Sequence, residues 1–170
     1  MAKRRSMTLS EHREALEKDP TRYAQYLARV KERDERIAKL GETVAADEAL
    51  LVREIRAQGY RIKSVWNLVN NKPHPVLRRT FTGSYEKAYP VLVNHLRVSH
   101  HLRVREGIIR ALIERKAAGL AGPALLRELK DEPIQELRWI IAYALRKLMP
   151  AAKRKSHPEI EAAYRAGSGL

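Results

Sequence analysis

The second half of the chain repeats itself with a constant offset of 33 residues. The segment 89–96, Tyr-Pro-Val-Leu-Val-Asn-His-Leu, aligns with 122–129, Gly-Pro-Ala-Leu-Leu-Arg-Glu-Leu. At the same offset, 104–112, Val-Arg-Glu-Gly-Ile-Ile-Arg-Ala-Leu, aligns with 137–145, Leu-Arg-Trp-Ile-Ile-Ala-Tyr-Ala-Leu. The pattern predicts stacked helical hairpins, because one hairpin cannot bury its apolar face alone. Such architectures typically bind other molecules, which favours recognition over catalysis.

The composition fits a helical protein with an aliphatic core. Apolar residues make up 44% of the 170 residues, but there are only one Phe and two Trp, so Leu, Ile, Val and Ala must fill the core. The absence of cysteine excludes disulfides and thiolate metal sites. No apolar stretch follows the basic start, so no secretory signal is expected, and no apolar run is long enough to predict a membrane span. We therefore expect a cytoplasmic protein without membrane contact.

The chain is strongly basic, with 34 Lys and Arg against 20 Asp and Glu and a net charge of +14. The excess is spread along the sequence and peaks in residues 73–121. Such a charge attracts polyanions, most strongly at low salt. Solvated helix faces also produce a positive excess, so the charge alone does not identify a partner.

The N-terminal region predicts two helices. Thr8 and Glu11 have the spacing of a capping box, which would open a short helix. Asp19 followed by Pro20 then predicts a new helix start, with Asp as N-cap and Pro at the first helical position. This second helix is expected to end at Gly41.

The apolar stripe of this long helix is narrow and is interrupted by Arg33. It consists of Tyr23, Tyr26, Val30, Ile37 and Leu40. Such a helix either lies along the repeats as a cap or pairs with a copy of itself. We favour the cap, because terminal repeats need a polar outer cover.

A further helix is expected over residues 44–58, stopped by Gly59, and a short one over 64–70. Residues 71–88 follow as the main irregular stretch, with Pro and Gly residues that interrupt helices and four basic residues against one Glu. Long irregular loops inside compact domains are usually functional or mobile. A basic segment and a weak helix are expected after Pro150.

A resemblance to a family of small bacterial HEAT-like repeat proteins covers residues 20–149. It rests on the segments 59–70, 89–92 and 104–112, with their Ser-Val-Trp and Arg-Glu-Gly-Ile elements. The resemblance implies a non-enzymatic α-solenoid and leaves the activity open. The chain departs from the family pattern at residues 73–88, where a shorter link is expected, so the basic loop is its most individual feature.

We therefore predict an all-α fold of HEAT-like helical-hairpin repeats, forming a right-handed α-solenoid with a long N-terminal helical cap. The cap comprises residues 1–41, and the repeat region 42–150 contains the irregular loop 71–88. Residues 151–170 are expected as a basic C-terminal tail. All three regions are expected to form one compact domain.

One segment has a faint likeness to an enzyme family. Trp66 and Asn70 match the Trp-x-x-x-Asp segment of HEAT-like alkylpurine DNA glycosylases, in which the Asp would stabilise the positive charge that develops during bond cleavage. Asn70 is neutral and cannot supply that stabilisation. Trp66 is therefore better interpreted as a core or capping residue, and the chain is not expected to be an enzyme.

Three histidines, His95, His100 and His101, are clustered in the sequence, and His74 is expected nearby in the fold. A metal site would require ligands that face one another. His95 is expected on a helix, whereas His100 and His101 fall in the turn that follows, so a turn and helix cap is the favoured interpretation. No metal and no cofactor are predicted.

The residues proposed to bind a partner combine exposed arginines with two loop aromatics. They are Arg78, Arg79, Phe81, Tyr85, Arg97, Arg103, Arg105 and Arg138. Arg105 and Arg138 occupy equivalent repeat positions, so they also suit a ladder that bonds to backbone carbonyls or to acidic residues of the adjacent turn. The expected partner is an acidic protein surface. The alternative is nucleic acid, bound through its phosphates without sequence specificity.

Overall fold

We describe the fold from a computed structural model of the chain, which defines residues 8, 10, 18–73, 75–76, 78–167 and 169. These residues form helices and connecting segments with no β-strand among them, which confirms the all-α prediction. The chain divides into two compact units, Met1–Thr43 and Val44–Leu170, where the sequence suggested one compact domain. None of the helices in the described part combines the length and apolarity that crossing a membrane requires.

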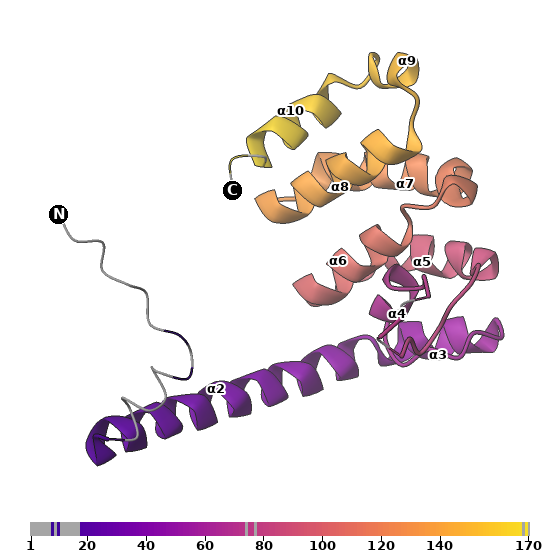
Figure 1. The fold of residues 1–170 in the computed structure, drawn as a ribbon. Coiled ribbons are helices and arrows are strands. Elements are labelled where there is room, and N and C mark those ends of the chain that lie inside the picture. The colour runs from indigo at the N-terminus through magenta and orange to yellow at the C-terminus, as the bar shows by residue number, and fades with distance from the viewer. Residues whose placement is uncertain are drawn as a thin grey trace. The chain divides into compact units, whose positions relative to one another are not determined.

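The long charged helix α2 spans Pro20–Asp47 (Figure 1). Asp19 caps its start, because a carboxylate oxygen accepts the N–H groups two and three residues further on at 3.2 and 3.1 Å. The helix continues through Gly41, where the sequence predicted its end. Gly41 does not adopt the positive φ with which glycine commonly ends a helix. The capping box of Thr8 with Glu11 depends on a residue outside the described part.

The second unit contains the remaining α-helices and two short 3-10 helices. In chain order they are α3 (Ala49–Ala57), α4 (Trp66–Val69), η1 (Glu86–Ala88), α5 (Tyr89–His95), α6 (Leu102–Ala111), η2 (Arg115–Ala117), α7 (Ala118–Asp131), α8 (Gln135–Leu148), α9 (Ala151–Arg154) and α10 (Pro158–Gly167). Gly59 has a φ of 94° just after α3, as expected for the glycine that stops this helix.

The helices of the second unit pack in two rows (Figure 1). In the first row, α3 packs on α5 and α5 packs on α7. In the second row, α4 packs on α6, α6 on α8, and α8 on α10. The rows are joined because α5 also contacts α6 and α7 contacts α8. One cluster of buried side chains, mostly Leu, Ile, Val and Ala, holds the two rows together.

The 33-residue offset is accurate for α6 and α8, which begin at Leu102 and Gln135. Equivalent residues are buried in both, as shown by the pairs Val104 and Leu137, Ile108 and Ile141, Ala111 and Ala144, and Leu112 and Leu145. The offset is less accurate for α7, which begins at Ala118 and holds Pro123 inside the helix. The first helix of the second repeat is therefore longer than its sequence equivalent.

The glycine of the Arg-Glu-Gly-Ile element, Gly107, allows α6 to approach α4 closely. A Cβ atom at this position would lie 2.5 Å from Cγ1 of Val65 and 3.1 Å from Nε1 of Trp66. Both distances are shorter than a normal van der Waals contact. Only glycine therefore fits here without a shift of the neighbouring side chains.

The C-terminal segment, predicted as a basic tail with a weak helix, contains the helices α9 and α10 and is packed against the rest of the second unit. Helix α10 lies against α8, and its residues Ile160 and Ala163 are buried. The guanidinium of Arg154 donates hydrogen bonds to the carbonyl oxygens of Arg146 and Met149 at 3.2 and 2.7 Å. The segment therefore extends the second row of helices by one further helix.

Candidate functional site

The irregular loop 71–88 is anchored to the core by aromatic rings. Phe81 is half-buried, and its ring stands edge-on to the rings of Tyr60 and Tyr85, with centroid distances of 5.7 and 6.2 Å. Near one end, Nδ2 of Asn71 donates a hydrogen bond to the carbonyl oxygen of Gly83 at 2.9 Å. Phe81 therefore ties the loop to Tyr60 of the preceding segment, and the bond between Asn71 and Gly83 closes the loop on itself.

Tyr85 belongs to the core, which corrects its assignment as a partner-binding anchor. Its side chain is only 2% exposed, and its hydroxyl group donates a hydrogen bond to the carbonyl oxygen of Ala111 at 2.8 Å. Burial raises the pKa of the phenol well above its usual value. Tyr85 therefore offers no surface to a partner.

The two arginines of the loop differ in accessibility. Arg78 is exposed. Arg79 is half-buried, and its Nε atom is fully covered and has no hydrogen-bond partner among the described residues. Arg78 is thus the more accessible cation of this pair.

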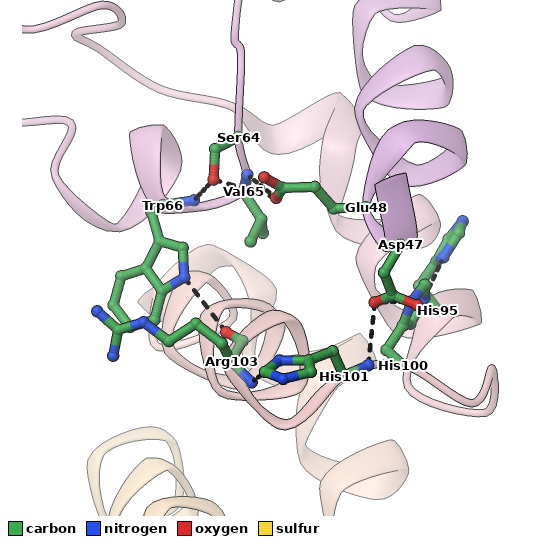
Figure 2. A network of polar contacts seen from close by, with 9 residues as sticks. All are labelled: Asp47, Glu48, Ser64, Val65, Trp66, His95, His100, His101 and Arg103. Atoms are coloured by element: carbon green, nitrogen blue, oxygen red, sulfur yellow. Dashed lines mark hydrogen bonds and ion pairs between the residues drawn. The ribbon is translucent and has the colours of Figure 1, made fainter. Parts of the chain in front are cut away.

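Arg103 covers the indole ring of Trp66 (Figure 2). The guanidinium carbon lies 4.1 Å from the ring centroid, and Nε1 of Trp66 donates to the carbonyl oxygen of Arg103 at 3.2 Å. The guanidinium also pairs with Glu106 at 3.3 Å, yet 58% of the Arg103 side chain stays exposed. Arg103 therefore combines a structural contact with an accessible charge.

Arg105 and Arg138 make internal contacts, which agrees with the ladder alternative. Arg105 forms ion pairs with Glu128, at 3.6 Å, and with the buried Glu132. Arg138 donates to the carbonyl oxygens of Leu129 and Glu132 at 2.9 and 3.0 Å. Both guanidinium groups hold α7 to its neighbours, so these residues are removed from the partner-binding set.

A hollow of about 520 Å³ lies beside the turn after α5. The cations Arg97 and Arg127 line it together with Arg105 and the carboxylates Glu128 and Asp131. Burial raises the pKa of Glu128, although the neighbouring guanidinium of Arg105 opposes this effect. Arg97 was predicted as a partner-binding residue, whereas Arg127 was missed because it lies on α7 and far away in sequence.

A second hollow, of about 530 Å³, lies at the other end of α5. Its lining includes Lys72 of the loop, Arg115 and Lys116 of η2, and the hydroxyl-bearing Tyr89. We call the surface that holds both hollows the α5–α7 face, because α7 begins near the second hollow and ends near the first. Its exposed cations are Lys72, Arg97, Arg115, Lys116 and Arg127, of which Lys116 pairs with Glu86.

Two of the histidines, His95 and His100, form a buried polar network that sequence reasoning did not expect (Figure 2). His95 and His100 are each only 4% exposed at the side chain, and their facing nitrogens lie 2.9 Å apart. The remaining nitrogen of His95 lies 3.1 Å from Glu54, and that of His100 lies 3.0 Å from Asp47. The side chains thus form a chain of four groups with a carboxylate at each end.

Replacing His100 by Ala should lower the free energy of unfolding by about 2–3 kcal/mol, because it leaves a ring nitrogen of the buried His95 without its partner and opens a cavity beside it. Urea denaturation at neutral pH measures this loss. Ser99→Ala, in the exposed turn next to it, should change stability by less than about 0.5 kcal/mol. Equal stability of the two variants would show that the network contributes nothing to folding.

The other sequence candidates are also structural. Nδ2 of Asn70 donates to the carbonyl oxygen of Trp66 at 3.2 Å, so this amide closes the short helix α4. His101 accepts the N–H of Arg103 at 3.1 Å and caps α6, as the turn-and-cap interpretation predicted. Among the described residues, no three His, Asp or Glu side chains are placed to hold a metal ion together.

Comparison of the chain with known protein families, with curated proteins and with solved structures finds no match in any of the three.

Proposed function

We propose that this chain is a non-catalytic binding protein that docks an acidic surface of a partner protein through the α5–α7 face and the loop 71–88. The scaffold of this proposal is a right-handed, HEAT-like solenoid of helical hairpins. The two rows of helices and the repeated burial pattern of α6 and α8 support this architecture. Adaptor, inhibitor and immunity roles all fit such a protein.

The observation that carries the proposal is that the second unit has more basic than acidic residues, and that most of its acidic residues already bind other groups of the chain. Residues 44–170 contain 23 Lys and Arg against 12 Asp and Glu. Nine of these carboxylates already bind groups of the same chain: Asp47, Glu48, Glu54, Glu86, Glu106, Glu128, Glu132, Glu159 and Glu161. Each ion pair leaves the net charge unchanged, so the positive excess of this unit resides on cations that have no carboxylate partner among the described residues.

Several cations of this surface are available to a partner. Lys72, Arg97, Arg115 and Arg127 are exposed, and Arg78 is exposed in the loop. None of the five forms an ion pair with a described carboxylate. Charges of this kind raise the association rate and select partners of opposite charge.

A protein surface fits this face better than a nucleic acid does. Carboxylates lie among its cations, with Glu128 and Asp131 beside Arg97, and Glu86 beside Lys116. A phosphate backbone would be repelled by these groups, since it presents negative charge at every nucleotide. A protein partner can place its own basic or neutral residues opposite them.

The test compares two charge-reversed variants of the full chain. Lys72→Glu/Arg97→Glu/Arg127→Glu changes the α5–α7 face. Lys147→Glu/Lys153→Glu/Lys155→Glu makes the same charge change on exposed residues of α8, of α9 and just after α9. The probe is fluorescently labelled polyglutamate, read by anisotropy at low salt. The first variant should bind at least about tenfold more weakly than the second.

Two results would contradict the proposal. Equal weakening by both variants would mean that only net charge attracts the acidic chain. Random duplex DNA that binds more tightly than polyglutamate, and weakens by orders of magnitude between about 50 and 200 mM salt, would favour nucleic acid instead.

A further inference from the structure

Helix α2 leaves most of its large apolar side chains exposed. None of its residues is buried, and four large apolar side chains on it are between 47% and 60% exposed: Tyr26, Leu27, Ile37 and Leu40. Most helical stability in proteins comes from packing of an apolar stripe rather than from intrinsic propensity. A helix of 28 residues with this exposure therefore has an apolar surface suited to a partner.

The stripe follows a heptad repeat. Tyr23, Val30 and Ile37 are separated by seven residues and occupy the a positions. Tyr26, Arg33 and Leu40 lie three residues after each of them, at the d positions. β-Branched residues at a, combined with Leu at d, favour two parallel strands in a coiled coil.

We propose that α2 pairs with α2 of a second copy of this chain, as a parallel, in-register, two-stranded coiled coil over residues 23–43. Charge complementarity supports the parallel arrangement. Arg29 occupies a g position and Asp34 the e position of the next heptad, which face each other across a parallel pair. An antiparallel pair would instead place g positions opposite each other, bringing Arg29 near Arg36 of the other copy.

Arg33 is the one polar residue in the seam. Its guanidinium pairs with Asp34 of its own helix at 3.1 Å and is largely exposed. The long side chain can reach water beside the seam, which lowers the cost of placing a charge there. A single polar seam residue reduces stability but fixes register and strand number.

Pairing would join two α5–α7 faces in one particle, which increases avidity for a multivalent acidic partner. The pairing itself does not depend on the proposed function. It is tested without any partner.

Sedimentation velocity of the full chain, from about 5 to 200 µM, measures the pairing, since a dimer's population depends on concentration. The wild type should shift toward twice the 19.5 kDa monomer mass. Ile37→Glu/Leu40→Glu should stay monomeric, and Ala38→Glu/Lys39→Glu on the outer face of α2 should still dimerise. A wild type that remains monomeric throughout overturns the proposal.

Cysteine cross-linking tests the orientation, because the chain contains no cysteine. Under oxidation, Ile37→Cys should form a disulfide with its own copy, whereas Glu35→Cys on the outer face should not. Arg29→Glu should weaken the dimer, and adding Asp34→Arg should restore it. A dimer that does not cross-link through Cys at 37 overturns the parallel arrangement.

Discussion

Arg105→Met should lower the free energy of unfolding by about 3–5 kcal/mol, because it leaves the carboxylate of Glu132 buried without its charge partner. The side chain of Glu132 is fully buried, and Arg105 is the cation that faces it. The pair joins α6 to the end of α7, so the loss should affect the contact between neighbouring hairpins. Urea denaturation, with the midpoint and slope fitted separately, measures the change.

Two control variants show whether the loss of stability comes from breaking the ion pair between Arg105 and Glu132 or only from removing an arginine side chain. Arg97→Met removes an exposed guanidinium and should change stability by less than about 0.5 kcal/mol. Arg105→Met/Glu132→Met removes both charges together and should recover most of the stability, because no unpaired charge remains. If the double variant is as unstable as Arg105→Met, the buried pair is not the cause.

The helical class and the repeat could be predicted from the sequence because they depend on local patterns. The apolar spacing of 104–112 and 137–145 matches the buried residues of α6 and α8. Helix ends were harder to predict. Gly41 and Pro123 both lie inside helices, because tertiary packing and the flanking residues outweigh the preference of a single residue.

The candidate site was predicted less well, since it depends on side chains that are distant in sequence. The histidine network joins Asp47 of α2 and Glu54 of α3 to His95 of α5 and His100 of the turn after it. Nothing in the local pattern shows which carboxylate will face which ring. The one available signal was the repeat itself, because equivalent arginines of stacked hairpins are expected to make ladder contacts.

The partner-binding residues were also hard to predict, because the sequence does not show which residues of the loop are exposed. An aromatic residue inside a basic irregular loop suggests an accessible anchor, and Phe81 is partly accessible. Tyr85 lies four residues later and is buried, because the chain re-enters the core just before η1. Two aromatic residues of one loop therefore differ in exposure, and only Phe81 stays partly accessible.

Tyr85→Ala should lower the free energy of unfolding by about 3–5 kcal/mol, because it removes a large buried ring and leaves a cavity. Tyr85→Phe keeps the ring and loses only the hydrogen bond to Ala111, so its expected loss is about 1 kcal/mol. If Tyr85 were instead a surface anchor, both variants would be as stable as the wild type. Denaturation at neutral pH distinguishes these outcomes.

The pH dependence of the same variants provides an independent check. Burial raises the pKa of Tyr85 above that of an exposed phenol, near 10, so the folded state holds the phenol proton more tightly than the unfolded state does. The resulting stability is fully present below about pH 10 and is lost as the pH rises beyond it. Burial also raises the pKa of Tyr89. Tyr89 is present in the wild type and in Tyr85→Phe alike, so its titration does not distinguish the two proteins. The wild type should therefore lose stability more steeply than Tyr85→Phe in alkaline solution, and parallel curves would mean that the Tyr85 phenol is not protected by the fold.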